Sequence, residues 1–223
     1  MRVALRWVLV AGVMVAAFSA LWVVAYRFIN PPITTLMVME RLRTDKLEQD
    51  WRPLAEISQN LQYAVIAAED ANFCLHGGFS IEDIRKALEE DGRRRGASTI
   101  SQQTAKNAFL WPDASWLRKG VEAGFTVLIE AFWPKSRILE VYLNIAEFGI
   151  GVFGAEAAAQ YYFGVSADAL TPDQAARMAH MLPSPRKREV RRVSAARIAK
   201  INEGVGYIAG NGDYDCLPDA DER

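Results

Sequence analysis

The chain has 223 residues, of which 51% are hydrophobic and 24% charged, so it does not have the composition of a disordered protein. Its 26 basic and 27 acidic side chains leave a net charge of −1, which excludes the overall basic surface of a nucleic-acid-binding protein. Its two cysteines are too few for a disulfide framework or a four-cysteine zinc site, and neither of its two histidines has a HExxH-type neighbour, so we expect no structural zinc site. The length allows one ordinary domain with attached segments.

The first predicted element is a membrane-spanning helix. Residues 7–26 carry no charge, and a helix of that length extends about 30 Å, the thickness of the hydrocarbon core of a bilayer. We therefore expect a tail over residues 1–6 and an uncleaved signal anchor over residues 7–29.

The charges around this helix predict its orientation. Arg2 and Arg6 precede the span and favour a cytoplasmic N-terminus, although arginines also follow it. In that orientation the rest of the chain faces the periplasm or the cell exterior. We expect a membrane-proximal linker over residues 30–56, a folded domain over residues 57–210 and an acidic tail over residues 211–223.

The folded domain is predicted to be mainly α-helical. Apolar residues recur at helical spacing throughout, and alternating strand patterns are confined to short pieces. A long amphipathic helix is predicted over residues 117–132, and Gly164 ends a later helix. Capping patterns mark three helix starts: Ser80-Asp83, Thr99-Gln102 and Thr171-Gln174.

Basic residues gather near the C-terminus. Between Arg186 and Lys200 there are seven basic residues and one acidic residue. Such a cluster is usually a solvated face. Beside a membrane anchor it is equally suited to contact with anionic lipid head groups, and the sequence leaves both interpretations open.

The first motif with chemical content is EDANFCLHGGFS, residues 69–80. A predicted helix ends in Glu69-Asp70, and an aromatic residue, a histidine and two glycines follow. A carboxylate among apolar residues has a raised pKa, which suits a general base. Taken alone, such an acidic pair is more often a solvated helix end.

Three further motifs follow in order. RRRGASTISQQTAKN, residues 93–107, places hydroxyl and amide side chains at a helix N-terminus, where anions bind; the alternative is a well-capped polar helix. In RKGVE, residues 118–122, Arg118 and Glu122 share a helix face, and this pattern alone predicts a surface ion pair. KSRILEVYLN, residues 135–144, and the following GIGVFGAEAAAQYYFG alone predict packed core helices.

Together, the ordered patterns EDxxFxxHxG, GxSTxxQQxxKN, RKxxE, KxxILxxYLN and GxxGxxxAxxxYFG resemble those of the family 51 peptidoglycan glycosyltransferases. The anchor, the Asn30-Pro31-Pro32 segment and the short length resemble the monofunctional biosynthetic peptidoglycan transglycosylases of Gram-negative bacteria. The resemblance runs from about Asn30 to Pro185. It implies a mainly α, lysozyme-like glycosyltransferase domain that polymerises lipid II into β-1,4 glycan strands, inverts the anomeric linkage and releases undecaprenyl diphosphate.

The resemblance also implies a role for each motif position. Glu69 is the general base on the acceptor 4-hydroxyl, and Glu122 assists at the donor diphosphate or orients the groups around it. Lys106, Arg118 and Lys119 hold the diphosphate, with a divalent cation, Mg²⁺ or Mn²⁺, as a candidate partner and no organic cofactor. The other positions line the cleft (Ser98, Thr99, Gln102, Gln103 and Asn107) or form the wall beside Glu69 (Asp70, Phe73, His76 and Gly77).

The implied partners are lipid II, the growing glycan strand, membrane lipids and other cell-wall synthesis or division proteins, without nucleic acid. The implied location is the bacterial inner membrane, single-pass, with a cytoplasmic N-terminus and a periplasmic catalytic domain. That compartment permits a disulfide between Cys74 and Cys216. Because Cys74 lies inside the first motif, we expect the two thiols to remain unpaired.

Three alternatives are weighed against this assignment. A lytic transglycosylase or lysozyme-like hydrolase also uses a glutamate in a helical fold, but it leaves Lys106 and Arg118 without a role. A membrane-anchored scaffold without catalysis explains none of the polar motifs. A transpeptidase is disfavoured, because the S-x-x-K match at Ser184–Lys187 is flanked by prolines and no K-T-G follows.

Overall fold

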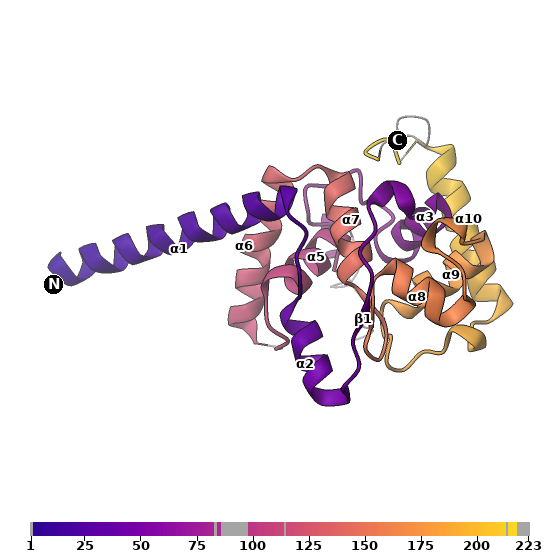
Figure 1. Ribbon diagram of the computed structural model, residues 1–223. Helices are drawn as coiled ribbons and strands as arrows, with labels where there is room; N and C mark the ends of the chain where they lie inside the picture. The colour runs from indigo at the N-terminus through magenta and orange to yellow at the C-terminus, as the bar shows by residue number, and fades with distance from the viewer. Residues whose placement is uncertain (1, 83, 86–97, 114, 213, 218–223) are drawn as a thin grey trace.

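Helix α1 (Arg2–Phe28) extends away from the rest of the protein (Figure 1). The computed structural model describes residues 2–82, 84–85, 98–113, 115–212 and 214–217. The helix contains a 26-residue stretch, Val3–Phe28, that is long and apolar enough to span a membrane. It begins at Arg2 rather than Trp7, so the expected N-terminal tail is largely part of the same helix.

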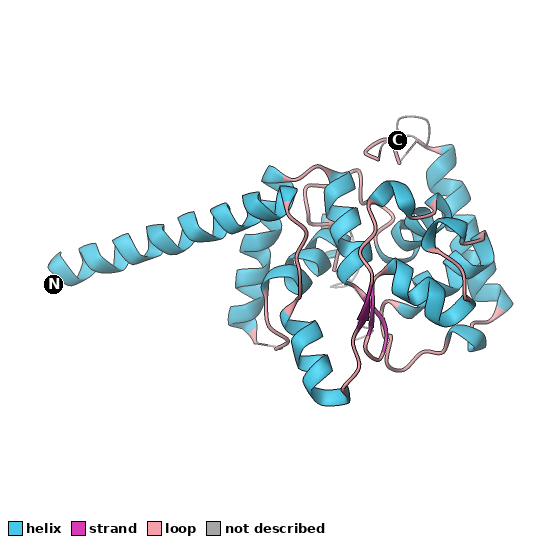
Figure 2. Cartoon of the chain, viewed as in Figure 1, coloured by secondary structure: helices cyan, strands magenta, loops and turns pink. Residues whose placement is uncertain are grey.

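The other helices form the body of the domain, which confirms the mainly α prediction (Figure 2). Those whose bounds the described residues give are α2 (Thr35–Thr44), α3 (Gln59–Glu69), α5 (Ile100–Phe109), α6 (Trp116–Phe132), α7 (Lys135–Ile145), α8 (Ala155–Phe163), α9 (Pro172–Met181) and α10 (Ala195–Gly210). Short 3-10 turns lie at Leu54–Glu56, Ala167–Ala169 and Val190–Arg192. Helix α3 packs against α9 and α10, and α5 packs against α6 and α7.

A small sheet joins the segment after the anchor to the domain. Its order is β1-β3-β2, with β1 (Glu48–Gln49) parallel to β3 (Val152–Phe153) and β2 (Glu147–Gly149) antiparallel to β3. Since α2 and β1 both lie within residues 30–56, that segment is a structured part of the domain rather than a linker.

Capping explains two of the predicted helix starts. The Thr99 side chain accepts from the backbone N–H of Gln102, and the Gln102 side chain accepts from the backbone N–H of Thr99, a capping box that begins α5. Thr171 and Gln174 begin α9 in the same way. The third predicted pair includes Asp83, which lies outside the described residues.

Aromatic rings fix the C-terminal end of α1 to the domain. The rings of Trp22 and Tyr26 lie 5.3 and 5.5 Å from the ring of Phe109 in α5. The indole N–H of Trp133 donates to the Val23 carbonyl at 2.8 Å. Aromatic pairs at such distances add stability beyond the area they bury, so the anchor is packed onto the domain rather than tethered to it.

A guanidinium group completes this joint. The Arg137 side chain donates to the carbonyls of Tyr26 and Ile29, at 2.9 and 3.1 Å. The last carbonyls of a helix have no intrahelical partner and carry partial negative charge, so a cation is favourable there. Arg137 belongs to α7, and the contact therefore links the end of α1 to a core helix.

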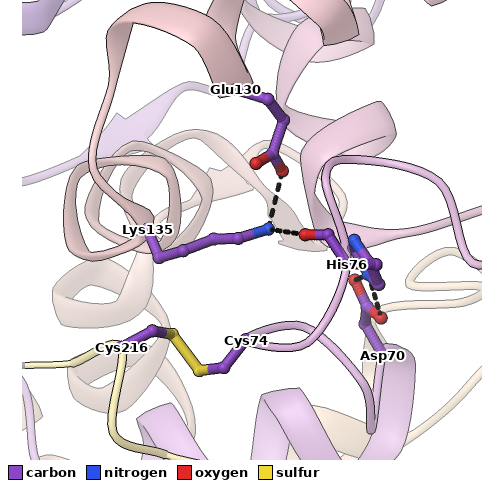
Figure 3. Close-up of a disulfide and its surroundings, with 6 residues drawn as sticks. All are labelled: Asp70, Cys74, His76, Glu130, Lys135 and Cys216. Atoms are coloured by element: carbon purple, nitrogen blue, oxygen red, sulfur yellow. Dashed lines mark hydrogen bonds and ion pairs between the residues drawn. A yellow bond between two sulfur atoms is a disulfide. The ribbon is translucent and has the colours of Figure 1, made fainter.

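The C-terminal segment returns to the domain and forms a disulfide (Figure 3). Cys74 and Cys216 are bonded, with their Cα atoms 5.4 Å apart, so the expectation of unpaired thiols is wrong. The Tyr214 ring stacks on Tyr63 of α3 with a centroid distance of 3.9 Å, and Leu217 is buried. The described part of the expected acidic tail is thus packed on α3, and this packing brings Cys216 to Cys74.

The double variant Cys74→Ser/Cys216→Ser is expected to lower the free energy of unfolding by about 3 kcal/mol, because the bond closes a long loop in the unfolded chain. Guanidinium unfolding in detergent, with and without reductant, measures this change. Reductant should destabilise the parent protein and leave the double variant unaffected. Identical unfolding curves for all four samples would contradict the prediction.

Candidate active site

Glu69 is the last residue of α3 and lies partly buried against α5. Its Oε2 accepts a hydrogen bond from Nε2 of Gln103 at 3.1 Å. Burial raises the pKa of Glu69 above its ordinary value of 4.5, while the Gln103 hydrogen bond and the charges of Arg188 and Arg197 oppose this rise. A carboxylate whose pKa is raised by burial, but limited by these neighbours, suits proton abstraction near neutral pH.

Asp70 connects the end of α3 to the start of α5. Its carboxylate is 4% exposed and accepts from the backbone N–H of Ile100 at 2.8 Å. Ile100 is the first residue of α5, where a negative charge is favourable. The same carboxylate accepts from Nε2 of His76 at 2.9 Å. Asp70 therefore has a structural role beside Glu69.

Lys135 of α7 also holds the loop that follows Asp70 in place (Figure 3). The Lys135 amine donates to the His76 carbonyl at 2.7 Å and to Glu130 at 2.8 Å. It also lies 4.6 Å from the centre of the Phe73 ring, which is fully buried. Phe73 and His76, predicted as the wall beside Glu69, therefore act as internal supports of that wall.

The His76 ring has a defined tautomer. Its Nδ1 accepts from the backbone N–H of Gly78 at 3.0 Å, so the proton on Nε2 is the one donated to Asp70. The His76 ring thus connects Asp70 to Gly78 and holds the loop next to the end of α3.

Both glycines of this motif are predicted to turn the backbone, and Gly77 to form part of the wall beside Glu69; in the structure Gly78 is the one whose position excludes a Cβ. Gly78 has φ +94°, and a Cβ there would lie 2.9 Å from side-chain carbons of Thr126 and Glu130. A Cβ on Gly77 would meet nothing within 4 Å. Only a residue without Cβ fits at Gly78 without strain.

The second motif divides into structural and site-facing residues. Thr99 and Gln102 are buried in the capping box, and the Thr99 hydroxyl donates to the Gly78 carbonyl at 2.7 Å, so both side chains hold the start of α5 in place. Gln103 contacts Glu69, and its Nε2 also lies 3.4 Å from the Ser98 carbonyl. Residues 93–97 of this motif, with the arginine run, lie outside the described residues.

The Arg118–Glu122 pair is buried rather than a surface ion pair. Glu122 is 2% exposed, and its Oε2 accepts from Nη1 of Arg118 at 2.8 Å, while its Oε1 accepts from Lys119. The surface interpretation fails because α6 turns this face toward α5. The buried Nε of Arg118 has no hydrogen-bond partner among the described residues, which leaves donor capacity for a ligand.

Lys106 of α5 joins this group. Burial lowers the pKa of Lys106, the nearby Glu122 carboxylate raises it, and Arg118 and Lys119 lower it. Among the described residues no side chain forms an ion pair with Lys106. Lys106 and Asn107 line a pocket of about 280 Å³. The structure thus collects three cations around the Glu122 carboxylate, and one of them, Lys106, is close enough to Glu69 for their charges to interact.

The donor set here does not suit a resident divalent cation. Both oxygens of Glu122 are already engaged by Arg118 and Lys119. Across the described ranges no group of three or more His, Cys, Asp or Glu side chains could hold a metal ion.

Sequence reasoning missed three residues near Glu69. Tyr142 of α7 is buried and its hydroxyl donates to Gln103 Oε1 at 3.1 Å; its motif predicts only core packing. Arg188 and Arg197 come from the basic segment 186–200. Helix α9 precedes this segment and α10 contains its last residues, and both helices lie on the side of the domain opposite α1 (Figure 1). Arg186, at the start of the segment, forms an ion pair with Glu40 of α2.

The fold and this site agree with a family assignment. The transglycosylase family model matches residues 36–205, and the chain belongs to that family. It is 54% identical to a biosynthetic peptidoglycan transglycosylase of Caulobacter vibrioides, over 96% of this chain and 93% of the relative. It is 50% identical to one of Jannaschia sp. (95% and 90%) and 49% identical to one of Xanthomonas campestris (95% and 91%).

The two glycines of the loop provide a matched test of its geometry. Gly78→Ala is expected to cost about 2–4 kcal/mol of stability, because it adds both left-handed strain and overpacking. Gly77→Ala should cost less than about 1 kcal/mol, since its Cβ meets open space. Thermal unfolding of both variants measures the difference, and similar losses for the two would contradict this geometry of the loop.

Proposed function

We propose that the protein is a peptidoglycan glycosyltransferase that polymerises lipid II into β-1,4 glycan strands and releases undecaprenyl diphosphate. The observation that carries this proposal is the presence, in one site, of a partly buried carboxylate, Glu69, and a cluster of cations, Lys106, Arg118 and Lys119. The names of the relatives support peptidoglycan as the material on which it acts.

Glu69 acts as the general base in this proposal. A sugar hydroxyl is a poor nucleophile, and a positioned base accelerates its attack by about 10²–10⁴-fold. The acceptor 4-hydroxyl gives its proton to Glu69 while its oxygen bonds to the donor anomeric carbon. The bond from that carbon to the diphosphate oxygen breaks on the opposite face, which inverts the linkage.

The cations stabilise the leaving group. The diphosphate departs with the electron pair of the broken bond, so fixed positive charge is most useful in the transition state. Lys106 provides an amine without an ion-pair partner in the described structure, and Arg118 provides an unused N–H. Glu122 holds Arg118 and Lys119 in place through its two oxygens and therefore acts on the diphosphate through them.

The same cluster favours synthesis over lysis. Cleavage of a glycan expels a sugar hydroxyl, which needs an acid to protonate it and no cationic site. Three basic side chains around a single buried carboxylate would have no function in such a reaction. A lytic enzyme is therefore the weaker candidate.

Membrane attachment suits a polyprenyl-linked substrate. Helix α1 is long and apolar enough to span the bilayer, and α2, the next helix in the chain, carries exposed apolar side chains that include Met39 and Leu42. We infer a cytoplasmic N-terminus and a periplasmic domain. The Cys74–Cys216 disulfide supports this orientation, because disulfides persist in oxidising compartments.

Glu69→Gln is expected to abolish polymerisation of lipid II with folding intact, because the amide keeps the shape of the side chain and cannot accept the proton. The measurement is polymer formation from purified lipid II. Glu203→Gln, at an exposed position of α10, is the matched control and should polymerise normally. Parent-like glycan synthesis by Glu69→Gln would reject the proposed base.

Lipid-free peptidoglycan, incubated with the parent protein in the same assay, should remain intact. Release of sugar fragments from it, with no polymer from lipid II, would identify a lytic enzyme instead.

The topology is tested with a reporter fused after Arg223. A periplasm-active reporter should give signal, and a cytoplasm-active reporter should not, because the lipid-II-binding domain is proposed to face outward. Cysteine labelling in cells adds an independent measurement, since Cys74 and Cys216 should react with maleimide only after reduction. A cytoplasmic reporter signal together with freely reactive thiols would reject the orientation.

A further inference from the structure

Three side chains from three helices form a chain of hydrogen bonds that ends on Glu69. The Tyr142 hydroxyl of α7 donates to Oε1 of Gln103 at 3.1 Å, and Nε2 of Gln103 in α5 donates to Oε2 of Glu69 at 3.1 Å. Tyr142 is 1% exposed, so water cannot replace this partner of its hydroxyl. A buried tyrosine hydroxyl needs such a partner.

The arrangement decides which way the Gln103 amide points. An amide carries a donor end and an acceptor end of nearly equal size, and either could face Glu69. Nε2 of Gln103 lies 3.4 Å from the Ser98 carbonyl, which can only accept. With the amide reversed, Oε1 would face both this carbonyl and the Glu69 carboxylate, and two acceptors would repel it.

The tyrosine is a reliable donor at this position. Burial and the negative charges of Glu69 and Asp70 raise the pKa of Tyr142 well above its ordinary value of 10.0. The hydroxyl therefore keeps its proton over the whole working pH range and continues to donate to Gln103 Oε1.

We propose that the Tyr142 hydroxyl is a positioning group for glycan polymerisation, which holds the Gln103 amide with its NH₂ toward Glu69 so that the buried carboxylate stays ionised. The inference rests on the proposed role of Glu69 as the general base. Tyr142 itself acts only through Gln103 and contacts no reacting atom.

Other charged groups also influence the pKa of Glu69, and substitution of Tyr142 leaves them unchanged. They are Asp70 beside it in the chain, Lys106 of α5, Arg188 of the segment after α9, and Arg197 of α10. Burial raises the pKa of Glu69, and the Gln103 hydrogen bond is the largest opposing influence. Loss of that hydrogen bond should raise the pKa further.

The test is the pH dependence of lipid II polymerisation by full-length protein carrying Tyr142→Phe, which removes one oxygen. Without the Tyr142 hydroxyl, the Gln103 amide is no longer held toward Glu69, and its hydrogen bond to the charged carboxylate is weakened or lost. We therefore expect the acidic limb of the kcat profile to move up by about one pH unit. At pH values above the limb, kcat should approach that of the parent, because Glu69 is ionised there in both proteins.

The matched control is Tyr162→Phe in α8. The Tyr162 hydroxyl donates to the Phe148 carbonyl at 3.1 Å, so this variant also loses one tyrosine hydrogen bond, but away from Glu69. Its acidic limb should coincide with that of the parent. An equal displacement in both variants would indicate a general structural effect and overturn the proposal.

Gln103→Ala separates an indirect effect from a direct one. Alone it should move the limb at least as far as Tyr142→Phe, and adding Tyr142→Phe to it should produce no further movement. A full displacement by Tyr142→Phe in the Gln103→Ala background would show direct action on Glu69 and overturn the proposal. An unmoved limb in Tyr142→Phe would do the same.

These outcomes are distinct from failure of the proposed function. If Glu69→Gln polymerises lipid II like the parent, the general base is wrong and the inference falls with it. If Glu69→Gln is inactive and Tyr142→Phe keeps the parent profile, only the positioning role is wrong.

Discussion

The carboxylate of Asp70 is the joint on which the site depends. It accepts from the first backbone N–H of α5 and from His76, and so fastens the end of α3 to the start of α5. Glu69 precedes it in the chain and Gln103 lies one turn into α5, which places the two side chains in contact. The loop that follows is then held in place by Lys135, Gly78 and the disulfide.

The site combines two groups that burial affects in opposite ways. Burial raises the pKa of Glu69 and lowers that of Lys106, so each is shifted toward its neutral form. Polar contacts counter both shifts, through Gln103 at the carboxylate and through Glu122 near the amine. The proposed reaction needs both groups charged, and their neighbours supply the necessary stabilisation.

The sequence was sufficient for the mainly α-helical class and for the family, because caps such as Thr99-Gln102 are local and the ordered motifs are specific, but it did not predict α2 within the expected linker. It was insufficient for features that depend on contacts between residues far apart in the sequence. Cys74 and Cys216 are 142 positions apart, and only the return of the chain over α3 brings them together. The choice of Gly78 over Gly77 depends on Thr126 and Glu130. Tyr142 lies in a helix of core-like pattern, and its spacing alone does not show that its hydroxyl meets Gln103.

The packed joint between α1 and the domain has a mechanical consequence. Trp22, Tyr26 and Arg137 fix the C-terminal end of α1 to the domain, so we expect the helix and the domain to tilt together. A bilayer thinner or thicker than the apolar length of α1 is accommodated partly by tilt. Because the helix and the domain are joined, tilting of α1 also moves the domain and changes the height of Glu69 above the lipid surface. In the proposed membrane-anchored state, the thickness of the bilayer therefore affects which part of a lipid-linked sugar Glu69 can reach.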